Sequence, residues 1–236
     1  ATGAVRDDRM KTVLLWDIDG TLLTTGRAGI FAWEKAAGEV AGYPVNLQDL
    51  KTGGLTDFAV GKAILDYLEL PASSDVLPRM VNSYEAHLPG VLPLREGRVL
   101  GGVLEVLQYC RTRRPDVDSY LLTGNTAAGA HAKLTYYGIA DYFLGGAFAR
   151  ETETRVDIAK RALEAVTDQD VNMLDHLFVI GDTPHDVTCG KAIGAKTVAV
   201  ATGEFTEHEL REYDPWRIID SVPDPESFLA MLEGTD

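Results

Sequence analysis

The sequence is poor in cysteine and has no long apolar run. Its only cysteines, Cys110 and Cys189, are too few for a disulfide framework, so we expect a reducing compartment, most simply the cytoplasm. No stretch approaches the ~18 uninterrupted apolar residues of a membrane span. Residues 1–11 are polar and charged, without the apolar core of a signal peptide. We therefore expect no membrane partner.

Basic residues are also scarce, since 22 Lys and Arg stand against 36 Asp and Glu and the net charge is −14. Proteins that bind the nucleic-acid backbone need clustered Lys and Arg, so we expect no nucleic-acid partner. This deficit does not exclude a small phosphorylated ligand, which a few local cations or one metal ion can hold. The 45% hydrophobic content excludes a disordered chain. The sequence identifies no oligomer interface.

Short apolar runs that end in polar residues or glycine dominate the chain. The strongest runs are residues 13–16, 120–122, 177–180 and 197–200, and weaker ones are 142–144 and 217–219. Such runs are typical of strands buried on both faces of a parallel sheet. Helical patterns alternate with them, for example at 127–137 and 158–166. We therefore predict an α/β fold with a doubly wound, mostly parallel, Rossmann-like sheet.

One interval breaks this alternation. Between the first two strong strands lie roughly a hundred residues, whereas a strand–helix–strand unit needs only ~30. Helical apolar spacing appears at 30–40, 60–68 and 76–88, where Pro89 and Gly90 are expected to end the last helix. We predict a helical cap domain over 25–91, inserted into a core of 1–24 and 92–236 that resumes with a helix at Arg98. The alternative is extra helices packed directly on the sheet.

Two carboxylates separated by one residue follow the first strand. Asp17 and Asp19 would repel each other unless a cation or a shared proton is present, so they indicate a metal site or an acid/base pair. Gly20 permits the tight turn that would bring both acids to the same space. The alternative is an ordinary Asp-Gly turn that leaves a strand.

Polar groups also follow two other strong strands. Asp182 and Asp186 lie at the end of the third, and such carboxylate oxygens suit Mg²⁺. Thr123 and Gly124 follow the second, where a hydroxyl and free N–H groups at a helix start form an anion site. A helix N-cap at Thr123 and a dipole-favoured acid at Asp186 are the alternatives. In doubly wound sheets the carboxyl ends of the strands face one ligand site.

These elements, in this order, resemble the haloacid dehalogenase-like hydrolases, and specifically the phosphatase branch similar to phosphoglycolate phosphatase. The resemblance covers nearly the whole chain. The matching motifs are residues 17–22, Thr123, and residues 181–183 with Asp186. The family also places a basic residue at a helix start before the last motif. Arg155 is our preferred candidate and Lys160 the alternative, and neither stands in the Lys-Pro pair that many relatives carry.

The resemblance implies an enzyme, a phosphoric monoester hydrolase, and a role for each motif. Asp17 would attack phosphorus to form an aspartyl-phosphate, and Asp19 would act as general acid and then general base. Thr123, Gly124 and the basic residue would hold phosphate oxygens. Mg²⁺ would be bound by Asp17, the backbone carbonyl of Asp19, Asp182 and, through water, Asp186. The substrate would be a small phosphorylated metabolite.

Other reactions of the same fold leave alternatives. Dehalogenases lack the second acid, so Asp19 favours phosphoryl chemistry. A sugar phosphomutase similar to β-phosphoglucomutase remains the nearest alternative, and a non-catalytic phosphate-sensing or interaction module is an alternative of another class. The insertion resembles the helical caps of this family. Arg27, Thr56 and Asp57 are candidates for substrate contact, although Thr56 and Asp57 equally fit a helix N-cap and a first-turn acid.

Overall fold

The computed structural model describes residues 11–71, 73, 75–167 and 176–234. Residues 1–10 lie outside this description. They include most of the polar N-terminal stretch and the beginning of the predicted core segment 1–24. The strands are β1 (Thr12–Trp16), β2 (Leu23–Thr24), β3 (Arg98–Val99), β4 (Val117–Leu122), β5 (Gly146–Ala147), β6 (Leu177–Gly181), β7 (Lys196–Val200) and β8 (Arg217–Ile219). The α-helices are α1 (Ala28–Ala41), α2 (Asp57–Tyr67), α3 (Val76–Val91), α4 (Val103–Arg113), α5 (Ala127–Tyr136), α6 (Arg155–Thr167), α7 (Pro184–Ala192), α8 (Glu207–Arg211) and α9 (Pro225–Glu233).

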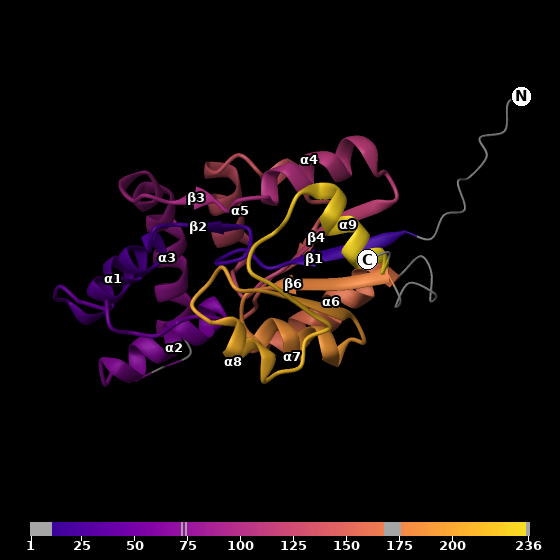
Figure 1. Ribbon diagram of the computed structural model, residues 1–236. Coiled ribbons are helices and arrows are strands. Elements are labelled where there is room, and N and C mark those ends of the chain that lie inside the picture. Colours follow the sequence, from indigo (N-terminus) through magenta and orange to yellow (C-terminus); the bar gives the residue numbers. More distant parts are fainter. Residues whose placement is uncertain (1–10, 72, 74, 168–175, 235–236) are drawn as a thin grey trace, which may run out of the picture.

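Six strands form the central sheet in the order β5-β4-β1-β6-β7-β8, and every pair in it is parallel. Helices lie on both faces of this sheet (Figure 1). The predicted fold class, a doubly wound parallel sheet with an inserted helical unit, is confirmed. The strong strands and the weak strand at 217–219 are found. The strand predicted at 142–144 is wrong, because a 3₁₀ turn occupies Ala140–Tyr142 and the edge strand pairs only from Gly146.

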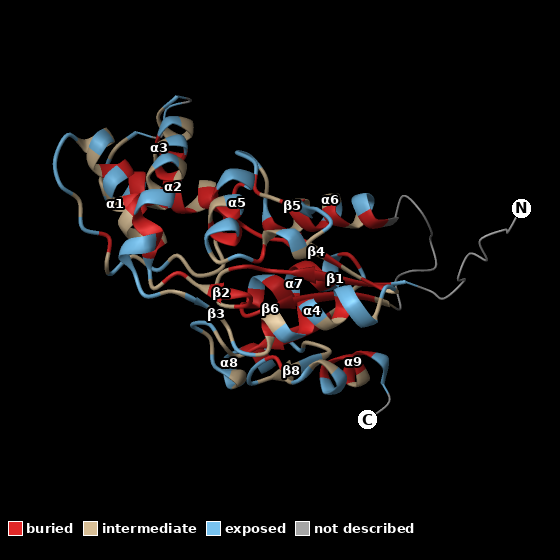
Figure 2. Cartoon of the chain, turned by 90° about the horizontal axis from the view of Figure 1, so that it is seen from above, coloured by how far each residue is buried: buried red, intermediate tan, exposed pale blue. Residues whose placement is uncertain are grey.

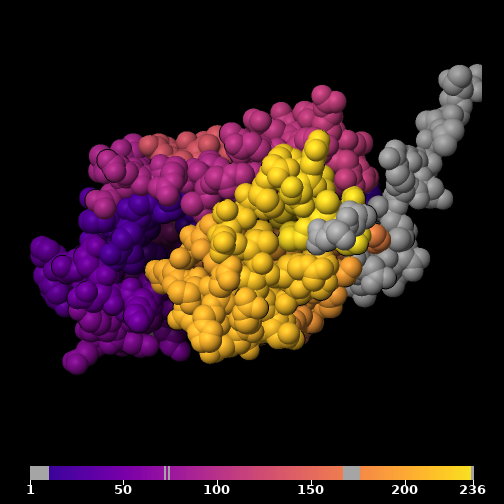
Figure 3. All heavy atoms as spheres, viewed as in Figure 1, coloured from indigo at the N-terminus to yellow at the C-terminus, as the bar shows by residue number. Residues whose placement is uncertain are grey.

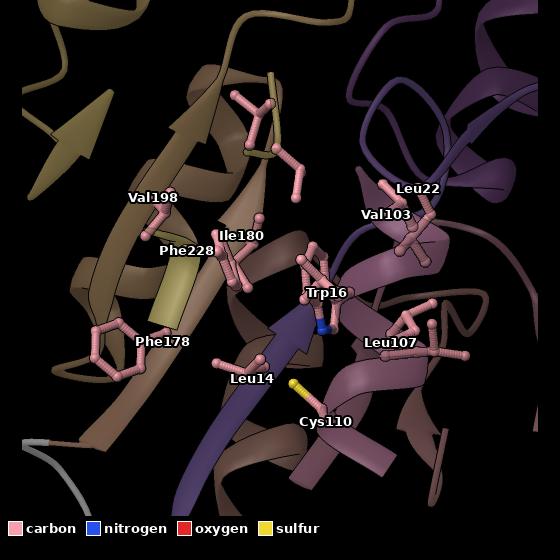
Figure 4. Packing of buried hydrophobic residues seen from close by; sticks show 14 of the residues in the cluster. Leu14, Trp16, Leu22, Val103, Leu107, Cys110, Phe178, Ile180, Val198 and Phe228 are labelled. Atoms are coloured by element: carbon pink, nitrogen blue, oxygen red, sulfur yellow. The ribbon is translucent and has the colours of Figure 1, made fainter. Parts of the chain in front are cut away.

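Alternate residues of β1 serve the two faces of the sheet. Leu14 and Trp16 point to the apolar cluster that includes Leu107 and Cys110 of α4, and Trp16 stacks on Phe228 of α9 (Figure 4). Val13 and Leu15 belong to the opposite cluster, built with residues of α6 and α7. Figure 2 shows the central strands as buried and the outer helix faces as exposed. This two-sided burial explains the uninterrupted apolar run in the sequence.

Helices α1, α2 and α3 form a unit that we call the insertion. This unit has its own apolar cluster. Trp33 of α1 stacks on Tyr84 of α3 with ring centroids 4.1 Å apart and planes 5° apart. Ile64 and Leu65 of α2 complete this cluster and are fully buried. Figure 3 shows the insertion, in indigo and violet, as a lobe beside the orange and yellow core. A separate cluster is what an independently packed cap requires.

The chain returns from the insertion differently from the prediction. Pro89 lies inside α3, which continues to Val91 and into a 3₁₀ turn at Leu92–Leu94. Near a helix end proline disturbs few remaining hydrogen bonds, so it does not terminate this helix. Arg98 belongs to β3, which pairs antiparallel with β2, while α4 begins only after Gly102. In the described part of the chain no helix is both long and apolar enough to cross a membrane.

Candidate active site

The predicted polar residues meet at the carboxyl ends of three neighbouring strands. Thr123 follows β4, Asp17 follows β1 and Asp182 follows β6, and these strands are adjacent in the order β4-β1-β6. The backbone N–H of Asp17 donates to the carbonyl of Ile180 at 3.0 Å, which continues the ladder to the first acid. Asp17 and Asp182 line a cavity of about 410 Å³ between the core and the insertion, whereas Thr123, although fully buried, is not among its lining residues.

Asp17, Asp182 and Asp186 form a buried acidic cluster. Each offers a carboxylate oxygen, and these oxygens lie within 4.8 Å of one another. Burial and the neighbouring Asp186 raise the pKa of Asp17 to about 7, although Arg155 opposes the shift. Burial, Asp186 and Asp17 raise the pKa of Asp182 well above its ordinary value. Oxygen ligands that repel one another in this way fit a divalent cation, which would remove the repulsion.

Two glycines make room for Asp182. Gly20 has a φ of +81°, and a Cβ there would overlap the Asp182 carboxylate. A Cβ at Gly203, in the loop after β7, would overlap the same carboxylate. Thr21 donates its hydroxyl to Asp182 Oδ1 at 3.0 Å. The acid is therefore held in one position by close backbone on two sides and a buried hydrogen bond.

Arg155 stands at the first residue of α6 and is the basic group that the structure brings to the acids. Its Nη1 lies 3.6 Å from Asp17 Oδ1, and its Nη2 pairs with Asp186 Oδ1. Burial alone would lower the pKa of Arg155, but the two carboxylates outweigh it and raise the pKa. Its Nε is buried without a hydrogen-bond partner among the described residues. Lys160 is exposed on α6 and does not line the cavity.

Thr123 does not cap a helix, whereas Asp186 lies in the first turn of one, as the alternative interpretation of the sequence expected. The N-cap of α5 is Thr126, not Thr123. Thr123 is instead fully buried, and its Oγ1 accepts hydrogen bonds from the backbone N–H and the Nδ2 of Asn125, which leaves its hydroxyl proton free to donate. Asp186 is both a member of the acidic cluster and the partner of Thr183 in the capping box that starts α7.

Asp19 lies at the rim of the cavity and has partners that the sequence did not reveal. Its side chain is 45% exposed, whereas that of Asp17 is 8% exposed. Lys133 of α5 donates to both Asp19 oxygens, at 2.8 and 2.6 Å, and Asn125 donates to Oδ2 at 2.8 Å. Lys133 belongs to the buried inner face of α5 with Ala130 and Leu134. The sequence feature that could have indicated this contact is a lysine within an otherwise apolar helical stripe.

The insertion candidates take different positions around the cavity. Thr56 caps α2, since its hydroxyl accepts from the N–H of Ala59. Asp57 lines the cavity, and its carboxylate accepts from the N–H of Thr126 at 2.8 Å, which ties the insertion to the start of α5. Burial raises the pKa of Asp57 to about 6. Arg27 is exposed at the cavity edge, adopts φ +67° and donates to the carbonyl of Gln48.

Comparisons with known proteins agree with this fold. The HAD-hydrolase-like family model matches residues 155–225. The protein named probable phosphatase IndB from Dickeya dadantii (strain 3937) is 26% identical over 220 residues, which are 90% of each chain. These two matches confirm the resemblance to haloacid dehalogenase-like hydrolases that the motifs indicate.

Solved structures of similar architecture include both phosphatases and mutases. A predicted phosphatase from Clostridium acetobutylicum superposes with a TM-score of 0.73 at 18% identity, over 95% of this chain and 99% of that one. A β-phosphoglucomutase from Clostridium difficile gives a TM-score of 0.71 at 16% identity, over 96% and 98% of the two chains. These likenesses establish the shared fold. The predicted enzyme class, a phosphatase of the haloacid dehalogenase-like type, is supported by the family match and by the relative named a probable phosphatase.

Proposed function

We propose that the chain is an Mg²⁺-dependent phosphatase that hydrolyses a phosphate monoester of a small metabolite, with an activity similar to that of phosphoglycolate phosphatase. The convergence of Asp17, Asp182 and Arg155 on one cavity wall, with Asp19 at its rim, is the observation that carries the proposal. Phosphoryl transfer depends mainly on positioning and on charge placed around the phosphate. This wall supplies both in a site largely withdrawn from water.

The donor set fits the proposed metal ion. Asp17, Asp182 and the backbone carbonyl of Asp19 would hold Mg²⁺, which prefers oxygen ligands and retains several waters. Both Asp186 oxygens already accept hydrogen bonds, from Arg155 and Thr183, so we assign Asp186 a contact through water. When bound, the ion would supply positive charge that neutralises the carboxylates and the phosphate. Burial and the neighbouring carboxylates raise the pKa of Asp17 and Asp182, and a cation bound between them would oppose that shift.

Each remaining site residue then has a defined task. Asp17 attacks phosphorus and carries the phosphoryl group as an aspartyl-phosphate, which divides one difficult displacement into two. Asp19 gives a proton to the leaving oxygen and later accepts one from the attacking water. Thr123 donates its free hydroxyl proton to a phosphate oxygen, the Gly124 backbone approaches the same group, and Arg155 provides guanidinium donors.

The insertion acts as a cap over this chemistry, with 25–91 as the cap domain and 1–24 with 92–236 as the core. The loop before α2 reaches the phosphate-site loop, because Asp57 donates its N–H to the carbonyl of Gly124 at 2.8 Å. Such closure excludes water from the reacting groups. We assign contact with the non-reacting part of the substrate to Arg27 and Asp57, which line the cavity, and to Thr56, which directly precedes Asp57. The buried, unpaired Cys110 and Cys189 fit a cytoplasmic enzyme.

A sugar phosphomutase is the second candidate, favoured by the similarity in fold to β-phosphoglucomutase. A mutase would use the same Asp17 and Asp19 but return the phosphoryl group to a sugar hydroxyl. A non-catalytic module would not need a nucleophile, a metal-binding cluster and an acid/base group in one cavity. The relative that is 26% identical is named a probable phosphatase, whereas the likeness to the mutase is one of fold, and we therefore favour the hydrolytic reaction.

One set of assays tests the proposal. Hydrolysis of p-nitrophenyl phosphate should require Mg²⁺, and Asp17→Asn should lower it by at least about 10⁴-fold, as loss of a nucleophile does. Activity that survives this substitution, or that EDTA leaves undiminished, contradicts the mechanism. Glucose 1-phosphate with a sugar bisphosphate primer separates the two candidates, because a phosphatase releases phosphate and a mutase releases isomerised sugar.

A further inference from the structure

Lys133 is a buried ammonium group in the cavity wall that the proposed reaction has not yet used. It stands on α5, is 4% exposed and lines the cavity beside Asp19. Lysine is rarely buried so completely unless its charge is paired. We therefore expect Lys133 to have a specific partner for its charge and a role in the site.

All three donors of this ammonium are committed to two residues. Nζ lies 2.8 Å from Asp19 Oδ1, 2.6 Å from Asp19 Oδ2 and 2.7 Å from Asn125 Oδ1. A lysine ammonium has three N–H donors and no acceptor. Lys133 thus has no donor left for a substrate oxygen, and whatever it contributes to the reaction passes through Asp19.

Asn125 extends the clamp to the phosphate site. Its Nδ2 donates to Asp19 Oδ2 at 2.8 Å and to Thr123 Oγ1 at 2.8 Å. One amide thereby fixes the relative positions of the acid/base carboxyl and the phosphate-binding hydroxyl. Because the Asp19 side chain is 45% exposed, packing alone does not hold it in one rotamer.

We propose that Lys133, together with Asn125, is a positioning residue that aims the Asp19 carboxyl at the leaving oxygen. This inference rests on the proposed function. Asp19 Oδ2 accepts from both Lys133 and Asn125, whereas Oδ1 accepts from Lys133 alone. Each carboxylate oxygen has two lone-pair sites, so the clamp leaves one free on Oδ1. We assign Oδ1 as the oxygen that transfers the proton.

The two half-reactions then balance around that oxygen. As Asp17 bonds to phosphorus, the bond to the leaving oxygen breaks, and that oxygen takes the proton from Asp19 Oδ1. A water molecule then attacks phosphorus and gives its proton to Oδ1, while the bond to Asp17 breaks and the electron pair returns to the Asp17 carboxylate. The products are an alcohol and phosphate, and Asp19 regains its proton.

A comparison of leaving groups tests this role. p-Nitrophenolate departs without protonation, whereas the alkoxide of ethyl phosphate does not. In Lys133→Met, the first turnover of ethyl phosphate should slow about 10²-fold, as loss of general-acid catalysis does, and p-nitrophenolate release by about threefold or less. Hydrolysis of the phosphoenzyme also uses Asp19, so p-nitrophenyl phosphate should give a one-equivalent burst and then slow turnover.

Matched variants separate positioning from a structural role. Asn125→Ala should show the same leaving-group pattern at about tenfold, and it keeps the proposal testable if Lys133→Met does not fold. Lys62 is exposed on α2, and Lys62→Met should change the rate for neither substrate. In an Asp19→Asn background, Lys133→Met should cause no further loss, because both changes remove one function.

The outcomes also distinguish this inference from the proposed function. Equal losses on both substrates, absence of the burst, or additive losses with Asp19→Asn overturn the role of Lys133 while the phosphatase stands. A wild-type protein that hydrolyses neither substrate, or an active Asp17→Asn variant, overturns both.

Discussion

The two walls of the cavity are built on different principles. The core wall carries charged groups, such as Asp17, Asp182 and Arg155, which the surrounding backbone and buried ion pairs hold in place. On the insertion side, beside Arg27 and Asp57, the lining contains a group of apolar and aromatic side chains, namely Ile30, Trp33, Leu50, Leu55, Val60 and Tyr84. Under the proposed function, the reaction chemistry is concentrated in the core, and the insertion would present the surface that a leaving group meets. Breaking each wall separately should therefore give different kinetic signatures.

After loss of the nucleophile itself, the largest effect should come from loss of Arg155, the cationic side chain of the core wall. Arg155→Met should lower kcat/KM for p-nitrophenyl phosphate about 10³-fold, because it removes the guanidinium donors beside Asp17. It also leaves buried carboxylates without their partner, so circular dichroism must confirm that the variant is folded. Lys160→Met, on the exposed side of the same helix, should stay within about twofold of the wild type. Comparable losses in both variants would place the phosphate site elsewhere.

A change that adds one methyl group to the core wall should rank second. In Gly203→Ala the new Cβ overlaps Asp182 and must displace its carboxylate. A displacement of about 1 Å in a catalytic group costs about 10²-fold, so kcat/KM and the apparent Mg²⁺ affinity should both fall. Gly101→Ala is the matched control, because its Cβ meets no atom within 4 Å. Full activity in Gly203→Ala would mean that Asp182 is not a ligand.

The acidic cluster also predicts how pH and metal act on stability. Raised pKa values of Asp17 and Asp182 mean that the metal-free folded protein holds protons that the unfolded chain has released. Its stability should therefore fall as pH rises from about 4 to about 7. Metal must displace these protons, so saturating Mg²⁺ should raise the melting temperature by roughly 5 °C at pH ~8 and less at pH ~5.5.

Asp182→Asn provides the control for that measurement. This variant removes one ligand and one titrating group, so the extra stabilisation at high pH should shrink. Equal shifts at both pH values, or a larger shift at low pH, would contradict the assignment of the cluster as the metal site.

The features that could be predicted from the sequence are those that depend on local pattern. The apolar runs end at Asp17, Thr123 and Asp182, and parallel strands bring such ends together, so the sheet edge could be predicted. The choice between Arg155 and Lys160 needed tertiary packing, since both lie on α6 and the fold buries only the first. Lys133 meets Asp19 across 114 residues of sequence, and no spacing rule reports such a contact. The short pairing of β2 with β3 was not predicted from the sequence for the same reason.

The smallest effect should come from the junction of the two walls. Asp57 belongs to the insertion, but its carboxylate accepts the N–H of Thr126 in the core and so joins the two walls. Asp57→Ala removes a charged hydrogen bond between the walls and should favour an open cavity, so the apparent KM should rise about tenfold. The kcat should change little, because the core wall is untouched. Asp66→Ala, an exposed acid on the same helix, should leave KM unchanged. Loss of kcat with an unaltered KM would show instead that Asp57 acts in the reaction. It would contradict the assignment of the reaction to the core wall alone.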